Sequence, residues 1–230
     1  MLAQKELLCL LQLASPILPV GAYSYSEGLE TLVEKGIISN SASLNDWLQR
    51  SLGQGSIRLE TAVLVRVYRC FCQEDFTKLN YWDNWLSATR ETAELRQQRW
   101  QMGRSLLNLL RELAPARDNL PEQANYATAF AIGASHWQIG EELAVLGYLH
   151  SWASNLINAG LRLIPLGQTL GQSLLIGLQP SLLTATADII SLADENLSSW
   201  SWGLSFASMN HETQYSLYFA VRNLERRAGE

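Results

Sequence analysis

Apolar residues recur at helical spacing along almost the whole chain, and the alternation typical of strands is nearly absent. The clearest amphipathic helix spans residues 91–113, where five apolar side chains share one stripe: Leu95, Met102, Leu106, Leu109 and Leu113. Other helices are expected near 7–14, 24–35, 43–53, 57–72, 76–88, 121–136, 143–158, 168–178, 182–192 and 199–208. We therefore predict an all-α fold, a single helical-bundle-like domain of about ten helices.

Prolines and capping residues predict where several of these helices begin and end. Pro16 ends the first helix, because proline cannot continue the hydrogen-bond ladder. Ser24 or Ser26 is expected to cap the second helix and Ser43 the third. Pro121 suits the first turn of the helix that runs to about residue 136.

The segment 209–216, close to the end of the sequence, reads Met-Asn-His-Glu-Thr-Gln-Tyr-Ser. It holds hydrogen-bonding side chains but no complete catalytic set, and a partner surface orders such a segment more easily than it orders itself. We therefore predict two parts, an all-helical domain at 1–208 and a mobile C-terminal tail at 209–230 that binds a partner.

The charge distribution excludes one large class of partners. The net charge is -5, and the basic residues are spread through 90–111 among acidic ones, so no basic patch for nucleic acid is visible. Between Glu142 and Asp188 the only formal charge is Arg162. Much of that region must be buried, in the core or against another chain.

Three sparse cysteines fit a reducing cytosol rather than a disulfide framework. Residues 7–13 imitate a signal peptide, but Glu6 and Gln12 make that the weaker interpretation. Residues 143–161 lack formal charge over about the length of a membrane span, yet their many polar side chains favour a buried helix. We expect a cytoplasmic protein without a membrane segment.

Local catalytic motifs are missing from the sequence. It contains no P-loop, no dinucleotide-binding glycine motif and no His-Glu-x-x-His zinc motif. The three histidines, His136, His150 and His211, lie far apart and none has a second ligand at metal spacing. We assign no catalytic, cofactor-binding or metal-binding residue and expect a binding protein rather than an enzyme.

Three sequence blocks stand out against this background. Residues 11–30 combine stiffening prolines with Tyr23, Tyr25, Glu27 and Glu30, which can project from a fixed turn, although an ordinary helix corner explains them equally well. In the second block, residues 94–107, Gly103 favours close helix–helix contact. The third block, residues 164–172, is uncharged, and its glycines at 167 and 171 also favour close packing.

Together with residues 148–155 and 207–216, these blocks resemble the urease accessory protein UreF family along nearly the whole chain. The resemblance implies an all-helical, non-catalytic, homodimeric chaperone of urease maturation. It also implies binding to a UreD/UreH-like scaffold, recruitment of a UreG-like GTPase and its regulation, and nickel insertion into apo-urease.

The resemblance also implies which residues bind the partners. The tail would contact the UreD/UreH-like protein through Met209, His211, Glu212, Thr213, Gln214 and Tyr215. The first block would add a partner-facing surface at Pro19, Gly21, Tyr23, Ser24, Glu27, Gly28 and Glu30. The same surface or the dimer interface would include Gln101, Gly103 and Arg104. The tail departs from the family after Ser216, where Leu217-Tyr218-Phe219-Ala220 replaces the usual Arg-Leu-Phe-Arg. Two alternatives follow: the tail docks with different charge contacts, or it continues as a helix.

Two alternative functions follow from the same residues. A small-molecule acid–base enzyme would need Glu27, Glu30, His150 or His211 to converge in one pocket. A direct nickel carrier would use His211, Glu212 and Cys9, but these do not form a clustered ligand set in the sequence.

Overall fold

The computed structural model describes residues 2–20, 27–89, 93–113 and 120–197. These residues form nine α-helices, one short 3-10 helix and no strand, so the all-α prediction is confirmed. The elements are α1 (Leu2–Leu13), α2 (Leu29–Glu34), α3 (Ser41–Gln54), α4 (Ser56–Cys72), α5 (Phe76–Ala88), α6 (Ala93–Leu113), α7 (Tyr126–His136), α8 (Glu141–Leu163), α9 (Gln168–Ile190) and η2 (Asp194–Asn196).

The centre of the domain is the packed pair α4 and α7. Both helices are buried over most of their length: α4 from Ile57 to Phe71 with few exceptions, and α7 from Tyr126 to Ala134. Helices α3, α5, α8 and α9 also contact α4, and α6 packs on α7. A helix covered on all sides needs apolar or small side chains all round, which explains the weak amphipathicity of α7 and its many alanines.

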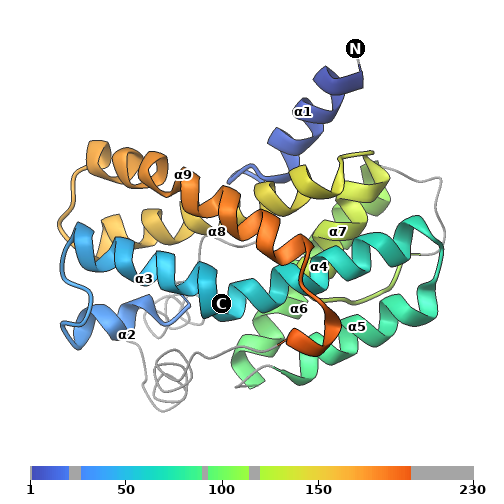
Figure 1. Cartoon of the computed structure of the whole chain (residues 1–230), viewed down its shortest axis with the longest axis horizontal. Helices are drawn as coiled ribbons and strands as arrows, with labels where there is room; N and C mark the ends of the chain where they lie inside the picture. The colour runs from blue at the N-terminus through green and yellow to red at the C-terminus, as the bar shows by residue number, and fades with distance from the viewer. Residues whose placement is uncertain (1, 21–26, 90–92, 114–119, 198–230) are drawn as a thin grey trace, which may run out of the picture.

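Two helices are less covered than the rest. Helix α1 projects from one corner of the molecule, with Leu7, Leu8 and Leu11 exposed (Figure 1). Helix α9 crosses in front of α8, on which it packs (Figure 1). It is long and apolar enough to cross a membrane by length and composition, with a mean hydropathy of 1.3 over its most apolar window and 28% of that window buried.

Several predicted boundaries are corrected by the structure. The second helix begins after Gly28, so among the described residues no serine caps it. Asn40 rather than Ser43 is the N-cap of α3: its side chain accepts from the Ser43 amide at 2.9 Å, and Ser43 completes the capping box. Helix α7 starts at Tyr126, five residues after Pro121, because the segment between them makes hydrogen bonds to α5.

The predicted break between residues 178 and 182 is wrong, because α9 is one helix from 168 to 190 with Pro180 inside it. Proline at 180 removes the hydrogen bond to the carbonyl of residue 176, and that residue is 63% exposed, so water can replace the bond. The close approach predicted for Gly171 is confirmed, since a Cβ there would lie 2.6 Å from a methyl carbon of Leu161. The same prediction for Gly167 is wrong, because nothing lies within 4 Å of its Cβ position. The helix expected at 199–208 and the predicted tail at 209–230 lie outside the described residues.

Candidate functional site

Three of the residue blocks singled out in the sequence, 11–30, 94–107 and 148–155, meet at one buried cluster of polar side chains. Glu27 precedes α2, Arg99 lies on α6, and Tyr148 and Trp152 lie one turn apart on α8. Glu60 joins them from the centre of α4. We call these five residues the Arg99 cluster.

Arg99 bridges the two carboxylates of this cluster. Its Nη2 donates to Glu27 Oε1 and lies 3.2 Å from Glu60 Oε1. Each carboxylate receives a second donor from α8: Trp152 Nε1 donates to Glu27 Oε2 at 2.9 Å, and Tyr148 Oη donates to Glu60 Oε2 at 2.8 Å. The cluster thereby connects α2, α4, α6 and α8 through side chains alone.

The cluster is almost completely removed from water. The side chains of Arg99 and Glu27 are 11% and 12% exposed, and that of Glu60 is 1% exposed. Burial on its own lowers the pKa of Arg99, but the carboxylates of Glu60 and Glu27 outweigh it and raise that pKa above its ordinary value. Arg99 is therefore permanently charged, and its cost of burial is offset by two anionic partners.

Glu27 adopts an unusual backbone conformation. Its φ is 49° and that of Gly28 is 80°, so the chain enters α2 through two consecutive left-handed residues. A left-handed conformation costs a residue with a Cβ roughly 1 kcal/mol. The contacts of Glu27 with Arg99 and Trp152 hold its carboxylate in place and offset this cost.

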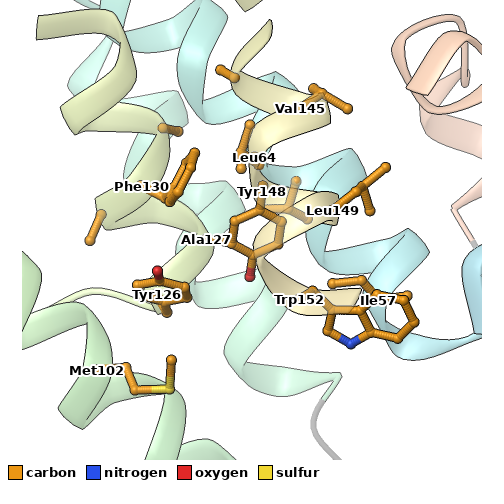
Figure 2. Packing of buried hydrophobic residues seen from close by; sticks show 14 of the residues in the cluster. Ile57, Leu64, Met102, Tyr126, Ala127, Phe130, Val145, Tyr148, Leu149 and Trp152 are labelled. Carbon is orange, nitrogen blue, oxygen red and sulfur yellow. The ribbon is translucent and has the colours of Figure 1, made fainter. Parts of the chain in front are cut away.

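A small cavity of about 30 Å³ adjoins the cluster. It is lined by Glu27, Arg99, Met102, Tyr126, Tyr148, Ser151, Trp152, Asn155 and Leu156. Figure 2 labels Tyr148 and Trp152 on one helix, and Tyr126 and Met102 on two others. A cavity of this size holds about one water molecule, far less than a small-molecule site of about 300 Å³ or more.

The position of α6, and with it Arg99, depends on Gly103 one turn further along. A Cβ at residue 103 would lie 2.0 Å from the carbonyl oxygen of Ala124, so only glycine allows α6 to approach the chain there. The next residue, Asn125, is held by α5. Its side-chain Nδ2 donates to Ser87 Oγ at 2.8 Å, and its backbone N–H donates to Asp83 Oδ1 at 2.9 Å.

The predicted partner-binding residues fall into three groups. On the surface or half-buried lie Pro19, Gly28, Glu30, Gln101 and Arg104, and Arg104 Nη2 donates to Gln123 Oε1 at 2.7 Å. Glu27 and Gly103 lie inside, where contacts within this chain explain them. Outside the described residues lie Gly21, Tyr23, Ser24, Met209, His211, Glu212, Thr213, Gln214 and Tyr215.

The described residues do not assemble the acid–base set. Glu27 lines the cavity, but His150 is exposed on α8 and Glu30 is absent from the lining. No three His, Cys, Asp or Glu side chains within the described ranges could hold a metal ion. Cys9 is half-buried on α1, and the other two proposed carrier ligands, His211 and Glu212, lie outside those ranges.

Sequence reasoning missed most members of the cluster. Arg99, Tyr148 and Trp152 lie within blocks that were singled out, but no pattern marked them individually. Glu60 carried a usable signal, because it is the one acidic residue of α4, a helix whose other residues are mostly apolar. A charge in such a position is expected to be buried with a partner.

Comparison with known proteins agrees with the resemblance seen in the sequence. The UreF family profile matches residues 38–179, more than half of the chain. A urease accessory protein UreF from Microcystis aeruginosa is 97% identical over 219 residues, covering 95% of this chain and 99% of that protein. UreF from Nostoc sp. is 56% identical over 95% of this chain and 97% of that protein. UreF from Psychrobacter cryohalolentis is 41% identical over 93% of each.

An all-helical domain with these matches along its length falls in the class of urease accessory proteins. The chain belongs to the UreF family.

Proposed function

We propose that this chain is a non-catalytic chaperone of urease maturation. With a UreD/UreH-like scaffold and a UreG-like GTPase it promotes the insertion of nickel into apo-urease. The observation that carries this proposal is the 97% identity, over 95% of the chain, to a protein named as a urease accessory protein UreF.

The Arg99 cluster supports a binding role rather than turnover. Its carboxylates are already paired with Arg99, Tyr148 and Trp152, and the adjoining cavity holds about one water molecule. Such a cluster fixes helices relative to one another and so presents a rigid surface to partners. Nickel enters this scheme as the cargo of the assembled complex.

The proposed role of the tail can be tested by co-expression with a UreD/UreH-like and a UreG-like protein, followed by size exclusion with light scattering. The full chain should co-elute with both partners. Removal of residues 209–230, or the single change Tyr215→Ala, should abolish or strongly weaken co-elution with the scaffold. Full binding by the truncated chain would refute the assignment of the tail.

The surface of α6 is the second proposed contact. Gln101 and Arg104 are exposed three residues apart on this helix, so they face the same side. Changing both to alanine should reduce binding of a partner while leaving the melting temperature unchanged. Arg50→Ala, an exposed arginine on α3, is the matched control and should bind as the parent does.

We also propose that the chain is a cytoplasmic homodimer. Large apolar side chains are exposed on α1 and α9, for example Leu8 at 68% and Ile176 at 63%, and burial of such groups commonly drives self-association. Light scattering of the chain alone should give twice the monomer mass of 25.7 kDa. A monomeric mass at micromolar concentration would contradict this part of the proposal.

A further inference from the structure

The last described turn of the chain is held by polar contacts rather than by its own burial. After α9 ends at Ile190, residues 191–197 form the segment we call the exit turn, which leads towards the tail. Its short helix η2 has no buried residue, and Leu192 and Leu197 are only half-buried. A segment with so little apolar burial has low local stability unless other contacts fix it.

Arg66 on α4 supplies those contacts. Its Nε donates to Asp194 Oδ1 at 2.7 Å, and its Nη2 donates to the carbonyl oxygen of Leu192 at 2.8 Å. The third nitrogen, Nη1, donates to the carbonyl of Ala62 at 2.8 Å, on the same helix. The guanidinium carbon also lies 5.1 Å from the ring centroid of Trp82. The side chain is thus fixed on one side by α4 and α5 and binds the exit turn with the other.

Two points of attachment, at 192 and 194, determine the direction of the exit turn as well as its position. A planar guanidinium binds both with a fixed geometry, whereas a lysine ammonium is a point charge on a flexible stem and sets no such direction. Arg66 is 7% exposed whereas the Asp194 side chain is 64% exposed. The rigid partner is therefore Arg66, and the exit turn is the part that moves if the contact is lost.

We propose that Arg66 is a positioning residue for partner binding, which fixes the exit turn and so the point at residue 197 from which the chain continues to the C-terminal tail. This inference rests on the proposed function, in which the tail binds the UreD/UreH-like scaffold. A tail that starts from a fixed point loses less conformational entropy on binding than one that starts from a free turn.

Arg69 provides a matched control on the same helix. Its guanidinium binds Glu141 with both oxygens, at 2.7 and 2.8 Å, and its Nη2 donates to the carbonyl of Ile190 at 3.2 Å. It therefore holds the end of α9, and its charge, on which Asp194 also acts, is kept when lysine replaces it. Arg69→Lys changes the same residue type three positions away and should leave the exit turn in place.

The experiment measures two quantities on the full chain carrying Arg66→Lys, Asp194→Asn or Arg69→Lys. The first is hydrogen exchange at the amides of Asn196 and Leu197, which donate to the carbonyls of Ala193 and Asp194 within the turn and report its opening. The second is the dissociation constant for a purified UreD/UreH-like protein. Asp194→Asn leaves α4 unchanged, so it remains informative should Arg66→Lys impair folding.

For Arg66→Lys and Asp194→Asn we expect faster exchange in the exit turn and a dissociation constant about 3- to 10-fold higher, from the lost pre-organisation. For Arg69→Lys both quantities should stay within about two-fold of the parent. Faster exchange with an unchanged dissociation constant would overturn the inference, and so would unchanged exchange in both variants. A chain ending at residue 197 that binds as tightly as the full chain would instead refute the proposed function, and the inference with it.

Discussion

Two buried arginines in the described part of the chain bind acidic partners in opposite settings. Arg99 contacts two carboxylates that are themselves buried, Glu27 and Glu60, at a junction of four helices. Arg66 contacts one carboxylate that is 64% exposed, that of Asp194, and completes its hydrogen bonds with backbone carbonyls. The same side-chain chemistry therefore joins core helices in one place and holds a surface turn in the other.

This difference indicates which of the two contacts mainly stabilises the fold and which mainly serves partner binding. A charge pair removed from water cannot lose one member cheaply, because the other is left buried and unpaired. A pair with one member in water loses its buried member more cheaply, because solvent then replaces the partner of the exposed one. Substitutions in the Arg99 cluster should therefore change the free energy of unfolding, and substitutions at the Arg66 contact should mainly change partner binding.

The largest effect is expected for Arg99→Ala. It leaves the carboxylates of Glu27 and Glu60 without their shared cation in the interior, which should lower the free energy of unfolding by about 3–5 kcal/mol. Urea denaturation followed by circular dichroism measures the change. The double variant Arg99→Ala/Glu60→Gln should recover part of the loss, because it removes one unpaired charge. A loss below about 1 kcal/mol for Arg99→Ala would show that the cluster is solvated. The Arg99 and Arg66 contacts would then not differ in their effect on stability.

Gly103→Ala should have the next largest effect. The added Cβ would meet the carbonyl oxygen of Ala124, which is backbone and cannot rotate away, so α6 must shift and carry Arg99 with it. We expect a loss of about 2 kcal/mol or more in thermal or urea unfolding. Gly177→Ala on α9 is the control: nothing lies within 4 Å of its Cβ position, so alanine should stabilise that helix by roughly 0.5–1 kcal/mol.

Alkaline pH should weaken the interior around the Arg99 cluster before it affects the exit turn. Burial, and after it the charge of Glu60, raise the pKa of Tyr148 well above its ordinary value, and burial also raises that of Tyr126. Outside the cluster, burial raises the pKa of Tyr68 to about 12. Each hydroxyl is therefore neutral in the folded chain at a pH where the unfolded chain is ionised.

The sign of the pH dependence follows from these raised values. Each contribution to stability is complete below the ordinary tyrosine pKa of 10.0 and is lost as pH rises through the raised pKa of the folded chain, which for Tyr68 is about 12. Melting temperature against pH, with phenolate absorbance recorded in parallel, checks this. In Tyr148→Phe the decline over this pH range should be shallower. A steeper or identical decline would show that Tyr148 does not carry the effect.

The helical architecture was predictable from the sequence because it depends on local periodicity. Helix α5 begins and ends where the pattern placed it, and α4 begins within one residue. The exceptions arise where tertiary contacts override local signals. Asn125 delays α7 by bonding to α5, and the exposed position of Pro180 lets α9 continue through it.

The site was predictable only in outline. The blocks that resemble the UreF family contain Glu27, Arg99 and Trp152, and the fold brings these blocks together. Which side chains pair could not be read from spacing, because Glu60 and Arg99 belong to different helices and meet only after α4, α6 and α8 pack. The close approach expected at Gly103 is present, but the group that α6 approaches there is the carbonyl of Ala124, which local helix propensity does not specify.

The smallest effect in the Arg99 cluster is expected for Trp152→Phe. Phenylalanine keeps much of the apolar packing but removes the Nε1 donor that binds Glu27 Oε2 at 2.9 Å. Arg99 still neutralises Glu27, so the loss should be about 1–2 kcal/mol, typical of one hydrogen bond to a charged acceptor. Urea denaturation of Trp152→Phe, Glu27→Gln and the double variant would show whether the two losses are coupled. Additive losses would mean that Trp152 acts by packing alone, and the cluster would then consist of the Arg99 charge pairs and the Tyr148 contact.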